Sequence, residues 1–386
     1  GSFLPNGITS SFLNLSHNLV AEGRVNQTVV LQPEAVFGDE QRVEKFRQLD
    51  DEVRVIGRVG SPAFRPEEEW LIKQYNLCFE FSSKEHEAIY FKAFQREFRR
   101  IFGEASFDSH VCFEGYARFW ASLLGTTGAD GNNTSKSIFM HSDMNRERVA
   151  RFPYLQSIFN IYSHFDKFAS VSDSVSSENI VNLAEEFDIP TNSFFTVENS
   201  IDSDQISLRA NEELDVELEK GMKYFCATGR LTREKGHDLL LSAFEIVYAH
   251  DRNTRLLLVG DGPLIEEYRV WVNQRGLSGA VIFTGYKENP LPIVRACDCF
   301  VFPSRYEGQG LSLIEALALG KPSIGCDVVG VRSVLANGEG LLVAPTVEGI
   351  AEGMIRFLEG RFNVQNQFDA RAYEARAMEQ FYSLIS

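Results

Sequence analysis

One pattern recurs through the second half of the chain: a short apolar run, a few turn residues and then a stretch with helical periodicity. After the first run, for example, Leu240, Phe244 and Val247 recur at helical spacing. Short β-rich runs that alternate with helices are typical of βα units around a parallel sheet. In such sheets ligands bind at the carboxyl ends of the strands. The runs lie at residues 223–231, 254–263, 280–286, 297–304, 321–328 and 340–345.

The first half shows the same alternation less regularly, so both halves are expected to be α/β. An aromatic-rich stretch at residues 87–102 has the periodicity of a helix with one buried face. A turn-rich stretch at 125–137 is expected to form a surface loop. The buried helix face would carry Phe91, Phe94, Phe98, Ile101 and Phe102. Strand candidates lie at residues 27–33, 51–60, 109–116, 137–144 and 167–174.

The chain divides at a polar segment. Its length of 386 residues exceeds that of one typical domain, which has ~100–200 residues. Residues 199–221 are polar, lack a strand pattern and separate the halves. We therefore expect a first domain at residues 1–205 and a second at 206–365, with a C-terminal helix at 366–386 that packs back on the first domain.

The start of the chain is irregular. A Gly-containing turn at Gly7 leads into a helical pattern, but no strand precedes it. A doubly wound sheet normally begins with a strand. The chain is therefore expected either to be a fragment of a longer protein or to open with a Gly-Ser left from cloning.

Charge and cysteine usage narrow the class of protein. The formal net charge is −16, which argues against a nucleic-acid partner, although a small basic pocket for a compact anion stays open. The six cysteines are scattered, so we expect reduced core residues in a cytoplasmic protein. Apolar runs fall far below the ~20 residues that span a bilayer, and no secretory signal is recognisable. Peripheral contact with the inner face of a membrane is left open.

Two turns could hold phosphate. The turn at Gly7 precedes a helical pattern, and backbone amides at a helix start favour anions. Arg230 and Lys235 follow the first strand of the second half. Arginine offers a planar fork of donors to phosphate oxygens and lysine a mobile charge, so together they can offset a diphosphate. The alternative for Gly7 is an ordinary turn, and for the two cations it is a solvated loop.

The segment "EGQGLSLIE" carries two acids around a glycine-rich bend. Glu307 follows a strand candidate, and Glu315 falls in the first turns of a helical pattern. Small residues before a helix start leave room for phosphate at the backbone amides. A carboxylate nearby can accept hydrogen bonds from sugar hydroxyls. The alternatives are a favourable position near a helix N-terminus for Glu315 and a surface loop for Glu307.

A histidine ends a strand candidate in the first half. His141 lies in "FMHSDM" with Asp143 close behind. Histidine titrates near neutrality and can hydrogen-bond a ligand, although a structural role is equally open. The remaining histidines and cysteines have no metal-ligand spacing, so no metal site is expected.

Five segments, in order, resemble a known family. From about residue 224 to 360, "GRLTREKG", "LVGDGP", "FTGY", "VFPSRYEGQGLSLIEALALGKP" and "GLLV" are similar to the donor-binding domain of retaining glycosyltransferases of family 4. These enzymes have the GT-B fold, in which two doubly wound parallel-sheet α/β domains face across a cleft. "ENSID" resembles the segment that leads into this domain, with Ser200 in place of the usual glycine. The first half, from His141 onward, resembles members that build bacterial cell-surface glycopolymers such as teichoic acids.

The resemblance implies roles for individual residues. Arg230 and Lys235 would hold the donor diphosphate, Glu307 would contact the transferred sugar, and Glu315 the nucleotide ribose. His141 corresponds to a histidine near the donor sugar. Gln309 stands where an aromatic residue such as Phe is common. The rest of the implied donor-binding set is Gly7, Gly229, Tyr286, Gly308, Gln309, Gly310 and Leu311.

The implied function is transfer of a sugar from a nucleotide-diphosphate donor, foremost a UDP-sugar, with retention of configuration. The acceptor would be a hydroxyl of a glycan or polyol-phosphate polymer, and the front-face reaction would use no metal or other cofactor. One alternative is a non-catalytic nucleotide-sugar-binding subunit of a glycosyltransferase pair. Another is a different GT-B enzyme, such as a nucleotide-sugar epimerase or a phosphorylase. The donor base and sugar, the acceptor and the oligomeric state are not specified by these motifs.

Overall fold

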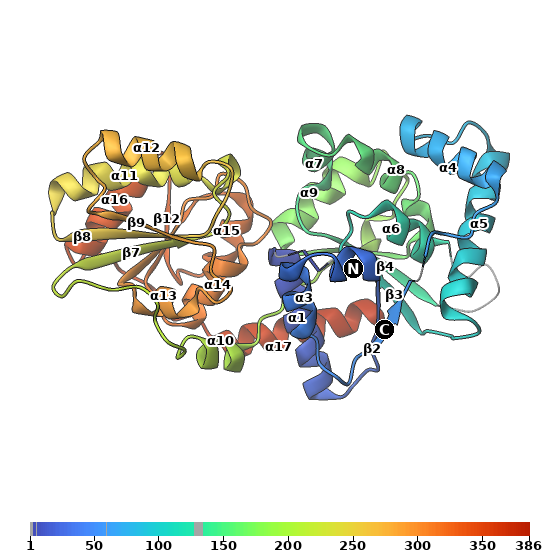
Figure 1. Ribbon diagram of the computed structural model, residues 1–386, viewed down its shortest axis with the longest axis horizontal. Coiled ribbons are helices and arrows are strands. Elements are labelled where there is room, and N and C mark those ends of the chain that lie inside the picture. Colours follow the sequence, from blue (N-terminus) through green and yellow to red (C-terminus); the bar gives the residue numbers. More distant parts are fainter. Residues whose placement is uncertain (1–2, 5, 59, 127–133) are drawn as a thin grey trace. The chain divides into compact units, whose positions relative to one another are not determined.

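The computed structural model describes residues 3–4, 6–58, 60–126 and 134–386. It divides into two compact units (Figure 1). Unit 1 comprises Gly1–Ser200 and Ala375–Ser386, and unit 2 comprises Ile201–Glu374. Within the surface loop expected at 125–137, residues 127–133 lie outside the described part of the chain, and residues 135–137 belong to a strand instead.

Unit 2 is built on a six-stranded parallel sheet with the order β12-β11-β10-β7-β8-β9. The chain adds β8 and β9 on one side of β7 and then returns to place β10 on its other side. The strand order therefore reverses between β7 and β10, and open α/β sheets bind ligands at such a switch point. The strands, all within the predicted runs, are β7 (Lys223–Thr228), β8 (Thr254–Val259), β9 (Val281–Gly285), β10 (Cys299–Phe302), β11 (Ser323–Cys326) and β12 (Leu341–Val343).

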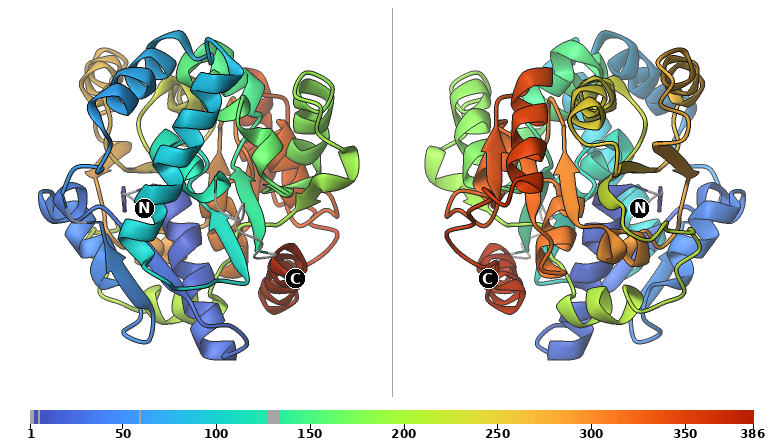
Figure 2. Two further views of the ribbon diagram at one scale, coloured as in Figure 1. Left: turned by 90° about the vertical axis from the view of Figure 1, so that its right-hand side faces the viewer. Right: turned by 90° about the vertical axis from the view of Figure 1, so that its left-hand side faces the viewer.

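Helices cover both faces of this sheet (Figure 1; Figure 2, right). In the view of Figure 1, α11, α12 and α16 lie above the strands, and α13 and α14 lie below them. The polar segment at 199–221 contains a helix, α10, which the sequence did not predict. The helices are α10 (Ser203–Arg209), α11 (His237–His250), α12 (Ile265–Gln274), α13 (Leu291–Ala296), α14 (Leu311–Ala318), α15 (Val329–Val334) and α16 (Val347–Leu358).

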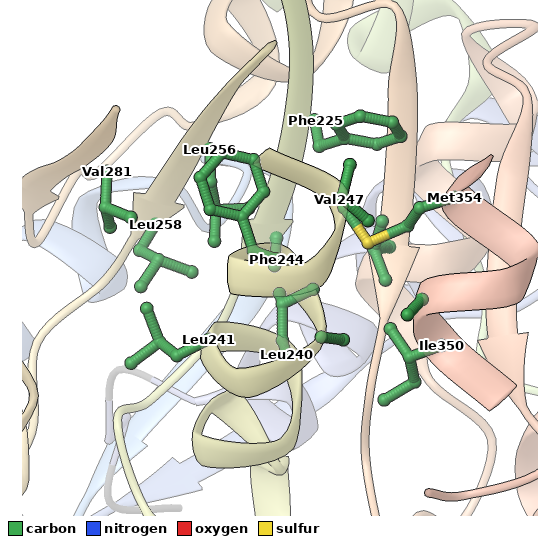
Figure 3. Packing of buried hydrophobic residues seen from close by; sticks show 14 of the residues in the cluster. Phe225, Leu240, Leu241, Phe244, Val247, Leu256, Leu258, Val281, Ile350 and Met354 are labelled. Atoms are coloured by element: carbon green, nitrogen blue, oxygen red, sulfur yellow. The ribbon is translucent and has the colours of Figure 1, made fainter. Parts of the chain in front are cut away.

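Alternation along the strands divides the core of unit 2 into two layers. Successive side chains of a strand point to opposite faces. Phe225 and Leu256 pack with Phe244 of α11 and Met354 of α16 on one face (Figure 3). Their neighbours Cys226 and Leu257 belong to the cluster on the other face, which α13 and α14 cover. Because both faces are buried, the strands are mostly apolar, which explains the short apolar runs in the sequence.

Unit 1 contains two separate parallel sheets. The larger has the order β3-β4-β5-β6, and the smaller consists of β1 and β2. The five predicted strands are confirmed, whereas β6 was missed because its three residues form too short a run. The strands are β1 (Thr28–Leu31), β2 (Arg54–Gly57), β3 (Ser109–Cys112), β4 (Ser135–Met140), β5 (Lys167–Ser170) and β6 (Phe194–Thr196).

The helices of unit 1 include the predicted aromatic one, α5. In α5, Phe94 and Phe102 are buried, and Phe91, Phe98 and Ile101 are half-buried. Among the described residues, no helix is both long and apolar enough to cross a membrane. The α-helices are α1 (Gly7–Glu22), α2 (Pro33–Phe37), α3 (Glu40–Arg47), α4 (Pro66–Cys78), α5 (Lys84–Phe102), α6 (Arg118–Gly125), α7 (Met144–Ala150), α8 (Gln156–Phe159) and α9 (Asp173–Leu183).

The last helix, α17 (Ala370–Ile385), begins in unit 2 and ends in unit 1. Its second part packs on α1, where Met378 and Leu384 join a cluster with Leu15 and Leu19. The Tyr382 hydroxyl donates a hydrogen bond of 2.7 Å to Glu22. The end of the chain is therefore part of the core of unit 1.

Candidate functional site

Two loops meet at the switch point of unit 2. The first follows β7 and contains a short 3-10 turn, η4 (Arg233–Lys235), and the second follows β10 and leads into α14. Their backbones touch. A methyl group built at Gly236 would lie 2.0 Å from the carbonyl oxygen of Pro303, and the φ of Gly236 is +68°. Only glycine allows this approach, so the close contact of the two backbones at this point requires Gly236.

The approach brings Lys235 and Glu307 together. Lys235 Nζ donates to Glu307 Oε2 at 2.5 Å, and the two side chains are 28% and 18% exposed. Nζ also lies 5.9 Å from the centroid of the Phe302 ring. An ammonium group has three donors and a carboxylate has two oxygens. The contact with Glu307 therefore leaves Lys235 with further donors, and Oε1 of Glu307 is available as an acceptor.

Arg230 is presented differently. It follows Gly229, whose φ is +142°, and its side chain is exposed, without a hydrogen-bond or ion-pair partner in the described part of the chain. The turn itself is rigidly placed. Leu231 N donates to Asp261 O at 2.9 Å, and a methyl group at Gly260 would lie 2.0 Å from Gly229 O. A fixed backbone thus carries a guanidinium that is free to contact an anion.

The glycine-rich bend at residues 308–310 leads directly into α14. Gly310 is the N-cap residue with φ +86°, and a methyl group there would lie 3.0 Å from the Phe302 ring. Behind the bend, a methyl group at Gly330 would lie 2.4 Å from the carbonyl oxygens of Glu307 and Gly308. The bend therefore packs against both β10 and α15. The amide groups at the start of α14 are directed toward the bend, which is the arrangement by which a helix start can bind an anion.

The remaining predicted residues of unit 2 take different positions. Glu315 and Leu311 are half-buried in α14, and Gln309 is buried with 2% of its surface exposed. Tyr286 follows β9 and is 46% exposed. β9 is the edge strand, two places from β7 in the sheet. Tyr286 is thus the predicted residue farthest along the sheet from the switch point.

His141 belongs to unit 1, at the carboxyl end of β4. Its Nε2 lies 2.6 Å from Phe113 O, and because a carbonyl only accepts, Nε2 carries the proton. Burial lowers the pKa of His141 to about 4, so the ring is neutral at pH 7 and Nδ1 is an acceptor. The buried Asn179 fixes the turn that follows, accepting from Met144 N at 3.0 Å and donating to Ser142 O at 3.1 Å.

Gly7 also belongs to unit 1, as the first residue of α1. The N-cap residue Asn6 accepts a hydrogen bond of 3.0 Å from Thr9 N, so the protein itself satisfies one amide of this helix start. A methyl group at Gly7 would meet nothing within 4 Å. The structure therefore shows no close approach that requires glycine at this position.

Three polar side chains that lie near the switch point were not predicted as site residues from the sequence. Thr228 ends β7, Ser304 follows β10, and His237 begins α11. All are at least nine-tenths buried, and Thr228 Oγ1, Ser304 Oγ and both ring nitrogens of His237 lack a hydrogen-bond partner among the described residues. An unsatisfied buried polar group costs about 1–3 kcal/mol. Thr228 and Ser304 could have been singled out in the sequence, because each is a hydroxyl residue at the end of an apolar run.

No group of three or more histidine, cysteine, aspartate or glutamate side chains in the described residues is arranged to hold a metal ion.

The candidate residues of unit 2 lie in a segment that is similar to a known protein family. Residues 209–375 match the model of the family described as "Glycosyl transferases group 1". This segment contains all the candidate residues of unit 2. An uncharacterised glycosyltransferase of Methanocaldococcus jannaschii is 31% identical over 186 residues, which cover 47% of this chain and 46% of that protein. The putative teichuronic acid biosynthesis glycosyltransferase TuaC of Bacillus subtilis is 28% identical, covering 61% of this chain and 66% of TuaC. The chain thus spans about half the length of the first of these relatives.

Solved structures resemble the chain along its whole length. HepE from Anabaena, crystallised with UDP and glucose, matches with a TM-score of 0.68 at 15% identity, over 99% of this chain and 97% of HepE. TarM from S. aureus, in complex with Fondaparinux, alpha-GlcNAc-glycerol and UDP, matches with a TM-score of 0.62 at 13% identity, over 98% of this chain and 94% of TarM. At these identities the likeness concerns the fold, and the predicted α/β GT-B class is confirmed.

Proposed function

We propose that the chain is a retaining glycosyltransferase, because residues 209–375 match the model of the glycosyl transferases group 1 family. It would move a hexose or N-acetylhexosamine from a nucleotide-diphosphate donor to a hydroxyl group. The observation that carries this proposal is the Lys235–Glu307 contact at the switch point, with the exposed Arg230 on the neighbouring turn. It is a cationic site with one acceptor oxygen, placed where α/β sheets bind ligands.

The charges suit a diphosphate with an attached sugar. Arg230 and the remaining donors of Lys235 would bind phosphate oxygens, and the amides at the start of α14 would add to the positive potential. Glu307 Oε1 would accept a hydrogen bond from a sugar hydroxyl, while Oε2 holds Lys235. Glu315, half-buried in α14, would contact the ribose. We propose UDP as the nucleotide, supported by HepE and TarM, whose crystals contain it.

The proposed reaction proceeds at one face of the sugar. The bond between the anomeric carbon and the phosphate oxygen breaks, and the acceptor oxygen bonds to the same face of that carbon. The electron pair of the broken bond stays on the phosphate oxygen, which takes the acceptor's proton. Lys235 and Arg230 would stabilise the charge that grows on this oxygen, which is the largest contribution that a preorganised site makes to such a step. In unit 1, the neutral His141 would offer Nδ1 as an acceptor for a sugar hydroxyl.

For the acceptor we propose a hydroxyl of a glycan or polyol-phosphate polymer of the cell surface. Support comes from the similarity to TuaC, which is named for teichuronic acid biosynthesis, and to TarM, which was crystallised with alpha-GlcNAc-glycerol.

A ligand screen tests the donor assignment. Nucleoside diphosphates and nucleotide sugars are compared by the rise in melting temperature that each causes, since a ligand that binds the native state stabilises it by mass action. UDP and a UDP-sugar are expected to cause the largest rise, and Lys235→Ala and Arg230→Ala are expected to reduce it. Lys223→Ala is the matched control, because Lys223 pairs with Asp298 at 2.9 Å at the opposite ends of the strands.

Transfer is then measured as release of the nucleoside diphosphate from the bound donor. Absence of any nucleotide-dependent rise would contradict the donor site. Binding without release, in the presence of glycan and polyol-phosphate acceptors, would instead indicate a nucleotide-sugar-binding subunit.

A further inference from the structure

We infer that Arg305 and Asp238 are positioning residues, which hold the turn that carries Lys235 against the loop that carries Glu307. The inference rests on the proposed function, since it assigns to this ion pair the placement of Lys235 on the donor diphosphate. Arg305 lies within one of the family-like segments quoted above, but the resemblance assigns no role to Arg305 or Asp238, and neither is proposed to touch the donor.

Arg305 joins the two loops through its backbone and its side chain. Its N–H donates to Glu234 O at 2.8 Å, one residue before Lys235. Its Nη1 donates to Arg233 O at 3.0 Å. Both acceptors are carbonyls of η4 (Arg233–Lys235), so a residue that follows β10 binds two successive peptide groups of the turn after β7. Arg305 lies two positions before Glu307, and it therefore couples the backbones that carry both partners of the Lys235–Glu307 contact.

Asp238 fixes the direction of the Arg305 side chain. Nη1 and Nη2 of Arg305 donate to Oδ1 and Oδ2 of Asp238 at 2.5 and 2.8 Å. Asp238 is the second residue of α11, so the pair anchors the loop to a helix that is packed into the core. Burial opposes ionisation of the Asp238 carboxyl, but the hydrogen bonds and charge of Arg305 outweigh it and lower its pKa below the ordinary value. The fork geometry requires a guanidinium.

The turn at Lys235 is thus held on both sides. On the C-terminal side, Gly236 packs against Pro303. On the N-terminal side, Arg305 donates hydrogen bonds to two carbonyl groups of the turn. A lysine side chain is long and flexible, so its placement depends on a fixed backbone and on its contact with Glu307.

Without the Arg305 side chain, Arg233 O loses its guanidinium donor, although the backbone N–H of residue 305 still reaches Glu234 O. Without Asp238, the guanidinium loses the carboxylate that orients it. In either case we expect the Lys235 ammonium to lose its defined position.

A purely structural ion pair would behave differently from a positioning one. Partly exposed ion pairs contribute little to the stability of a fold. Their loss changes the melting temperature slightly and leaves the chemistry intact. Misplacement of a group that stabilises the transition state lowers kcat, with a smaller change in KM for the donor.

The experiment compares kcat, donor KM and melting temperature in the full chain. Arg305→Ala and Asp238→Ala are each expected to lower kcat roughly tenfold to hundredfold. The double variant should lose little more than Arg305→Ala alone, because each single variant already removes the contact between Arg305 and Asp238. Arg255→Ala is the control, since Arg255 forms a comparable fork of 3.1 and 3.0 Å with Glu219 at the amino-terminal end of β8. It is expected to change the melting temperature by a similar amount and to leave kcat unchanged.

Two further variants separate the outcomes. Arg305→Lys keeps the charge without the fork and is expected to resemble Arg305→Ala, whereas full activity would overturn the requirement for a guanidinium. Asp238→Asn keeps the shape of the side chain and covers the case in which an alanine variant fails to fold. Unchanged kcat in the Arg305 and Asp238 variants, with Lys235→Ala inactive, would overturn the inference and leave the proposed function standing. Full activity of Lys235→Ala itself would overturn the donor assignment on which the inference rests.

Discussion

The Lys235 ammonium lies 2.5 Å from a carboxylate oxygen of Glu307, although 72 positions separate the two residues in the chain. The contact joins the loops after β7 and β10, the two strands between which the order of the sheet reverses. A cation whose charge is partly offset by a carboxylate keeps two donors for an anionic ligand. Predictions about this site and its surroundings follow from the contacts that hold it.

Substitution Glu307→Gln removes the charge that orients Lys235 and keeps the size of the side chain. Turnover is expected to fall roughly 10²-fold, because the ammonium is no longer fixed and the acceptor for a sugar hydroxyl is altered. Release of nucleoside diphosphate from the donor measures the effect. Asp298→Asn is the matched control, since Asp298 pairs with Lys223 at 2.9 Å at the amino-terminal ends of the strands. Equal losses in both variants would show that charge removal alone is responsible.

A second prediction concerns the close approach of the two loops. Gly236 and Gly276 have the same φ of +68°, but only Gly236 has a neighbour within reach of a methyl group. Gly276→Ala is expected to lower the free energy of unfolding by about 1–2 kcal/mol, the cost of a left-handed alanine. Gly236→Ala should cost more, because its methyl group would meet Pro303 O at 2.0 Å, and it should also reduce turnover. Urea unfolding compares the two, and equal costs would contradict the steric argument.

The third prediction is a dependence of stability on pH. Burial lowers the pKa of His237 to about 4, with Lys235 adding to the shift and Asp238 opposing it. In the unfolded chain His237 has an ordinary pKa near 6.5. Between these values the unfolded state binds a proton that the native state does not. Stability contributed by the neutral ring is therefore complete above about pH 6.5 and declines as the pH falls toward 4.

A comparison of His237→Gln with the wild-type protein checks the direction of this pH dependence. The variant should lose stability less steeply between pH 6.5 and 4, by up to about 1.4 kcal/mol per pH unit. Unfolding free energies at several pH values give the slopes, and parallel slopes for the variant and the wild type would rule out a neutral buried His237.

The fourth prediction concerns the six thiols. Cys78 is exposed, whereas the other five cysteines are buried, and none is in a disulfide. Burial raises the pKa of Cys112 and Cys326 to about 12, so these groups are not thiolates at neutral pH. A thiol reagent should label one cysteine in the native protein and six after unfolding. Cys78→Ser should abolish the native labelling, and labelling of a second thiol would show that part of the core opens.

The local pattern of the sequence was sufficient to predict most strands of the chain. The apolar runs at 223–231 and 297–304 contain β7 and β10, because strands buried on both faces need apolar residues at most positions. The same reasoning missed β6 and α10, whose three and seven residues are too few to form a clear pattern. In unit 1 it did not predict that β1 and β2 form a sheet of their own.

The sequence by itself therefore determined the α/β class, the strands of unit 2 and the residue types able to bind a diphosphate, because periodicity and composition are local properties. Only the tertiary structure decided which of these residues meet. The contact of Lys235 with Glu307, the fork between Arg305 and Asp238, and the burial of His237 depend on the strand order that places β10 beside β7. Strand order is set by the packing of the whole sheet, and no spacing between residues 235 and 307 encodes it.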